Sequence, residues 1–131
     1  MQNLHFIVGI SGIFAFIGTG QYMHIALNEL RDMDDASRML YRSAHIYILL
    51  AAFMNILLSV AEIKIPYRWI ERFTAILCLA MPGVMTLEFF YGPKTIEAHR
   101  DLVFFSVLGI LVCSAFLAFT KLVMKRFYSE L

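Results

Sequence analysis

Four long stretches of the sequence are almost free of charged residues, and they limit the folds open to this chain more than any other feature. They cover residues 6–27, 44–61, 73–91 and 102–122. Each is close to the roughly 20 apolar residues with which an α-helix crosses about 30 Å of hydrocarbon. Backbone amides and carbonyls find no water inside a membrane, so each stretch has to be helical. The sequence therefore predicts four transmembrane helices.

The composition favours a membrane protein over a soluble one. Of the 131 residues, 60% are hydrophobic and 16% are charged, whereas soluble domains are about half apolar and about one-quarter charged. This length suits one domain, which we expect to occupy residues 1–131. The net charge of +1 and the absence of a polybasic tract argue against nucleic acid as a partner. The partner that the composition predicts is the lipid bilayer.

The connections between the four stretches are short, which predicts that neighbouring helices run antiparallel. The predicted fold is all-α: an integral membrane bundle of four antiparallel helices with the N- and C-termini on the same side. The most charged connection spans residues 28–43, so we expect the first two helices to extend past the bilayer and turn near Asp32–Asp34. Asp34 or Asp35 would then cap the second helix. Pro82, followed by Gly83, predicts a kink in the third.

Basic residues indicate the orientation only by a small margin. The predicted side of the termini carries six of the 11 Lys and Arg residues and the opposite side carries five, and it is Lys and Arg that mark the cytoplasmic side of a membrane protein. The basic tail that follows residue 122 favours cytoplasmic termini, and the expected location is a bacterial inner membrane.

Three of the four histidines fall at the end of the predicted bundle that lies opposite the termini: His24, His45 and His99. His24 and His45 have similar predicted depths on adjacent helices, so their rings could face one another. Gly18 and Gly20 leave backbone space there for a close neighbour or for a flat ligand.

Further polar residues are predicted to lie inside the bundle. Glu88 is about one turn from the end of the third helix, and we expect it to be buried with Arg42, Arg100 or a histidine as its partner. The second helix carries a stripe at helical spacing, and lipid offers such a stripe no hydrogen-bonding partners, so it should face the interior. The residues of this stripe are His45, Ala52, Asn55, Ser59 and Glu62.

Three interpretations of the histidine end remain open. One is a haem b site with His24 and His45 as axial ligands and Arg38 or Arg42 on a propionate. Another is a transition-metal site that uses two or three of His24, His45, His99 and Glu88. In the third, the histidines are interfacial groups bonded to water or to an acid, and the polar stripe only holds helices together. Both His5 and His99 are expected to be solvated.

These interpretations give one leading function and two alternatives. The leading function is a small polytopic membrane protein that binds one haem or metal ion near the face opposite its termini and acts in redox or cofactor handling. The first alternative is an oligomeric transporter or channel protomer, with the polar stripe along its path. The second is an accessory or assembly subunit of a larger membrane complex. No nucleophile–base motif indicates catalysis without a cofactor.

Overall fold

The computed structural model describes residues 2–60 and 68–91, together with residues 104, 107–109, 111–112 and 115. This part of the chain contains the helices α1 (Gln2–Ile25), α2 (Asp35–Val60) and α3 (Arg68–Tyr91). A short turn, η1 (Asn28–Leu30), lies between α1 and α2. The described residues include no strand, so the predicted all-α class is confirmed for them.

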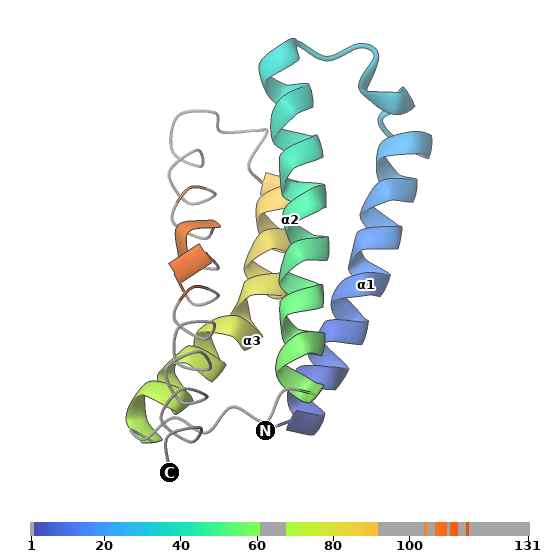
Figure 1. Cartoon of the computed structure of the whole chain (residues 1–131). Helices are drawn as coiled ribbons and strands as arrows, with labels where there is room; N and C mark the ends of the chain where they lie inside the picture. The colour runs from blue at the N-terminus through green and yellow to red at the C-terminus, as the bar shows by residue number, and fades with distance from the viewer. Residues whose placement is uncertain are drawn as a thin grey trace.

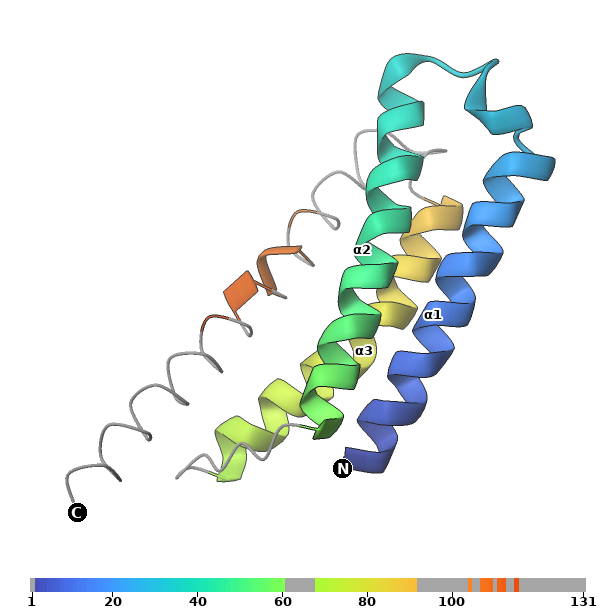
Figure 2. The same ribbon diagram turned by 45° about the vertical axis from the view of Figure 1, so that its right-hand side comes forward.

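Within the described residues, three helices are long and apolar enough to cross a membrane. They overlap the predicted stretches at residues 6–27, 44–61 and 73–91. The fourth predicted stretch, residues 102–122, lies mostly outside the described residues, although the described positions within it are helical. Figures 1 and 2 show neighbouring helices running in opposite directions, with α2 in contact with both α1 and α3.

Two glycines allow α1 and α2 to pack closely. A Cβ atom placed on Gly9 would lie 2.6 Å from Cγ1 of Ile56, and one placed on Gly12 would lie 2.8 Å from Cβ of Ala52. Side chains cannot approach this closely, so only glycine fits at these two positions. Small residues at a helix contact are a common way for membrane helices to bring their backbones together.

The turn between α1 and α2 has an unusual backbone. Asn28, Glu29 and Leu30 have φ angles of 47°, 58° and 64°, in the left-handed region that residues other than glycine rarely adopt. Leu30 is 2% exposed and belongs to the same buried cluster as Tyr41. The left-handed turn thus places an apolar side chain in the core at the point where the chain reverses.

The start of α2 agrees with the sequence analysis. Oδ2 of Asp34 accepts a hydrogen bond of 3.0 Å from the backbone N–H of Ser37, which is the geometry of an N-cap. The helix begins at Asp35, well before residue 44, as expected for a helix that extends past the apolar stretch. α1 ends at Ile25, inside the predicted stretch 6–27, so the expectation that this helix also extends past the bilayer is wrong.

A bend in α3 accompanies Pro82, which lies inside the helix. Proline has no N–H to donate to the carbonyl four residues earlier, and its ring crowds that carbonyl. The predicted kink is therefore confirmed. The half of α3 that follows the bend carries Met85 and Phe89, which are fully buried beside α2.

Candidate functional site

His45 is the histidine at the predicted site that the structure fixes most firmly. It lies on α2, is half-buried, and points at α1. Its Nδ1 atom is 2.9 Å from Oγ1 of Thr19. Its ring stacks on Phe16 with centroids 4.0 Å apart and an interplanar angle of 15°. One face of the ring and one nitrogen are thus held by α1.

The bond to Thr19 favours a proton on Nδ1 of His45. Oγ1 of Thr19 lies 2.9 Å from the carbonyl oxygen of Ala15 and 3.0 Å from that of Phe16. The single hydroxyl hydrogen can be directed at one of these carbonyls. In that arrangement the hydroxyl oxygen accepts from Nδ1–H of His45. In the neutral ring, this leaves Nε2 with its lone pair.

Gly20 keeps the space beside that second nitrogen free of a side chain. A Cβ atom placed on Gly20 would lie 3.2 Å from Cε1 and 3.5 Å from Nε2 of His45. Gly18 behaves differently, because a Cβ placed there would meet nothing within 4 Å. Of the two uses suggested for these glycines, Gly20 serves the close approach of the His45 ring.

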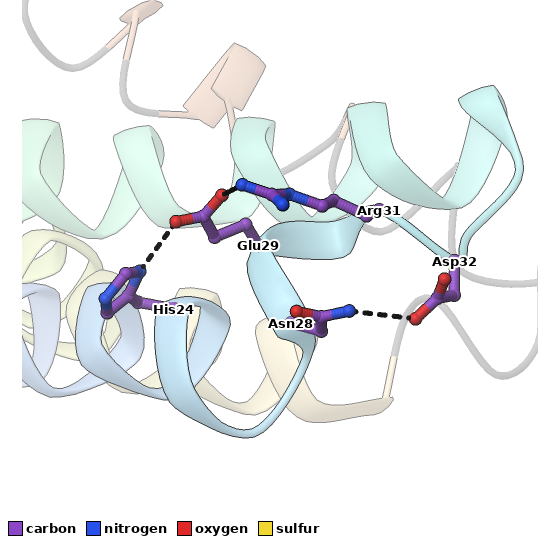
Figure 3. Close-up of polar contacts among 5 residues, drawn as sticks. All are labelled: His24, Asn28, Glu29, Arg31 and Asp32. Atoms are coloured by element: carbon purple, nitrogen blue, oxygen red, sulfur yellow. Dashed lines mark hydrogen bonds and ion pairs between the residues drawn. The ribbon is translucent and has the colours of Figure 1, made fainter.

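His24 contacts a different group from His45. It lies at the end of α1, and its Nδ1 atom is 3.2 Å from Oε1 of Glu29. Arg31 approaches the other oxygen of Glu29, and Asn28 donates to Oδ2 of Asp32 at 3.2 Å, so a polar network covers the turn (Figure 3). The hydrogen bond and the charge of Arg31 lower the pKa of Glu29 below its ordinary value. In this arrangement His24 is an exposed member of the surface network.

The other predicted site residues have separate environments. Arg42 is exposed on α2. Glu88 is 7% exposed on α3, so its predicted burial is confirmed. His99 lies outside the described residues. Within residues 2–60, 68–91 and the few positions beyond, no three His, Cys, Asp or Glu side chains come close enough together to hold a metal ion. Because His99 is outside this set, ligation by His24, His45, His99 and Glu88 stays a prediction.

His5 was expected to be solvated, and this was wrong. The side chain is 4% exposed, and its Nδ1 atom lies 2.7 Å from Oδ1 of Asn55, which is itself fully buried. Nδ2 of Asn55 donates to the carbonyl oxygens of Ala51 at 3.0 Å and of Cys78 at 2.7 Å. These two acceptors fix the orientation of the amide, so His5 is the donor to Oδ1.

One sequence signal pointed towards this contact. Asn55 belongs to the polar stripe of α2. The prediction that the stripe faces the interior is confirmed for Ala52 and Asn55, which are completely buried, whereas His45 and Ser59 are half-buried. A buried amide needs partners, and His5 is a polar side chain on the antiparallel neighbour near the same end of the bundle. Glu62, the last residue of the stripe, lies outside the described residues.

Comparisons with protein-family models, with curated proteins and with solved structures found no match to this chain.

Proposed function

We propose that this chain is an integral membrane protein that binds one haem b or transition-metal cofactor through His45 and acts in redox or cofactor handling. In this proposal, residues 102–122 form the fourth helix of an antiparallel bundle, and both termini face the cytoplasm from a bacterial inner membrane. The cofactor lies towards the membrane face opposite the termini.

The observation that carries the proposal is the hydrogen bond between Thr19 and His45. Histidines that ligate metals usually donate their other ring N–H to an oxygen, which fixes the tautomer and orients the ring. Thr19 provides such an oxygen, and the stacked ring of Phe16 restricts the orientation further. His45 is therefore preorganised to present Nε2 as a ligand atom. Neutral imidazole suits haem iron, copper and zinc.

Gly20 supports the same proposal. Because a side chain at residue 20 would crowd Cε1 and Nε2 of His45, glycine preserves the access that a cofactor needs to reach Nε2. His24, His99 and Glu88 are the candidates for the remaining ligand positions. Arg42, exposed a few residues from His45 on α2, is the candidate partner for an anionic group of the cofactor.

The transport alternative draws less support from the geometry. The amide of Asn55, at the centre of the polar stripe, donates to carbonyls of α2 and α3 and accepts from His5 of α1. An amide so engaged joins helices and has little capacity left for a passing solute.

Two neighbouring glycines provide a matched test of the cofactor proposal. Gly20→Val should abolish binding because its side chain would occupy the space beside Nε2 of His45. Gly18→Val makes the same change where nothing lies within 4 Å, so it should retain the cofactor. The measurement is haem extraction and elemental analysis of the purified proteins, expressed per chain. Equal cofactor content in the two variants, or none in the wild-type protein, would contradict the proposal.

A further inference from the structure

We propose that α3 contains a hinge at Pro82 and that Asn55 is the latch that holds it. In this proposal, the half of α3 before the hinge, Arg68–Met81, is an arm that can move relative to α1 and α2. The bond from Asn55 to the carbonyl of Cys78 keeps the arm in the position seen here. The inference is independent of the proposed cofactor.

The hinge follows from the covalent structure of proline. In an α-helix, the carbonyl of Cys78 would accept from the N–H of residue 82. Residue 82 is proline and has no N–H, so the backbone bond that would cross this point of α3 cannot form. Gly83 follows, and a Cβ placed on it would meet nothing within 4 Å. Proline and glycine are the residues at which helices most often kink.

The latch replaces the donor that proline removes. Nδ2 of Asn55 lies 2.7 Å from the Cys78 carbonyl oxygen, which is the carbonyl affected by Pro82. The donor comes from α2, so the bond connects two helices where a backbone bond would have stayed within one. His5 donates to the same amide from α1. Asn55 is thus held on one side by α1 and itself holds α3 on the other.

The two halves of α3 are anchored differently. After the hinge, Met85 and Phe89 are fully buried, and the Phe89 ring contacts those of Tyr41 and Tyr22 at centroid distances of 5.3 Å and 6.1 Å. Before the hinge, the large side chains of Trp69, Phe73 and Ile76 are exposed. Met81 is buried in a small cluster with Ala51 of α2, and Leu77 packs against that cluster. The other buried side chains of the arm are the small ones of Thr74, Ala75 and Cys78. Figures 1 and 2 show this half diverging from α1.

The structure also leaves space beside the hinge. A groove of about 500 Å³ runs between α1 and α3, and both Pro82 and Gly83 line it. On the α1 side its lining includes the small residues Ser11, Gly12 and Ala15. The fourth α1 residue of the lining is Val8, so a change in the bend of α3 into this groove meets no α1 side chain larger than valine.

Distance measurements between spin labels test the latch directly. One label replaces Phe73 on the arm and the other replaces Leu57 on α2, because these side chains are 65% and 58% exposed. The full chain, in nanodiscs and without other cysteines, should give one narrow distance distribution. Asn55→Leu should broaden or lengthen it. Thr86→Val is the control, because that hydroxyl donates only within α3, to the Pro82 carbonyl at 2.7 Å, and the distribution should stay narrow. A narrow, unchanged distribution in Asn55→Leu would overturn the proposal.

A double-mutant cycle keeps the test decisive if Asn55→Leu folds poorly. Pro82→Ala restores an N–H that can donate to the Cys78 carbonyl, so the helix no longer needs the donor on Asn55. The loss of melting temperature caused by Asn55→Leu should therefore be clearly smaller in the Pro82→Ala background, and folding of the double variant should recover. Equal losses in both backgrounds, or no recovery, would show that Asn55 does not act through the proline.

Discussion

Two side chains, Thr19 and Asn55, are hydrogen-bonded to histidines on neighbouring helices. In each case a group fixed by backbone carbonyls accepts from Nδ1–H of a histidine on another helix. The two histidines differ in their surroundings. Nε2 of His45 lies beside a glycine, whereas His5 is almost completely enclosed. This contrast is why we propose ligand binding for His45 and a structural role for His5.

At the level of single residues, the hydrogen bonds of Asp34 predict how the stability of the protein depends on pH. Ser37 donates to its carboxylate from the side-chain hydroxyl and from the backbone N–H, and these hydrogen bonds lower the pKa of Asp34 below its ordinary value. A carboxyl with a lowered pKa in the folded state stabilises the protein above its unfolded pKa, and the contribution disappears as the pH falls through the folded pKa. The melting temperature of the wild type should therefore exceed that of Asp34→Ala at neutral pH, and the two should converge below about pH 4.

Asp35 provides the control for this comparison. Its side chain is 98% exposed and forms only a surface ion pair with Arg38 at 3.4 Å, and such pairs contribute little. Asp35→Ala should therefore melt close to the wild type throughout the pH series. An Asp34→Ala difference that persists at the lowest pH would exclude the charged cap as its cause.

At the level of the helices, the close contact of α1 and α2 depends on glycine. Gly12→Leu should destabilise the protein by about 1–3 kcal/mol, the usual cost of overpacking, because even a Cβ at residue 12 would lie 2.8 Å from Cβ of Ala52. Gly18→Leu is the matched control on the same helix and should leave stability unchanged or raised. Unfolding in mixed detergent, followed by circular dichroism, measures both. Equal stability of the two variants would mean that α1 and α2 do not pack as described.

Sequence patterns predicted the helices well and their ends less well. Length and hydropathy located α1, α2 and α3, Asp34 marked the start of α2, and Pro82 marked the bend. The early end of α1 could not be predicted, because the left-handed turn at Asn28–Leu30 contains no glycine. Burial of Leu30 and the network around Glu29 accompany that turn, and both depend on the folded chain.

The candidate site was predicted only in part, because its contacts also depend on the folded chain. Sequence position indicated that His45 and Glu88 lie inside the bundle, and helical periodicity indicated that Asn55 does. The partners of these groups come from other helices, and the pairing of a side chain with Thr19 or His5 depends on the rotation of each helix about its axis. Depth in a span is encoded by position along the chain, but rotation follows from tertiary packing.

At the level of the whole molecule, the proposed function requires that the helices cross a bilayer. Single cysteines replacing Gln2 and Trp69, at the starts of α1 and α3, should react with a membrane-impermeant maleimide from one side of a vesicle. A cysteine replacing Arg31, in the turn after α1, should react from the other side. All three positions are exposed. Reaction of all three from the same side would rule out this topology.

The visible absorption spectrum of the purified protein, oxidised and then reduced with dithionite, tests most directly whether His45 binds a redox cofactor. Binding of a redox cofactor by His45 predicts absorption that changes on reduction in the wild-type protein, with a shifted Soret band and sharp α and β bands if the cofactor is haem b. These features should be lost in a folded His45→Ala variant. A spectrum without cofactor bands from well-folded wild-type protein that is also free of metal, or an unchanged spectrum in His45→Ala, would contradict it.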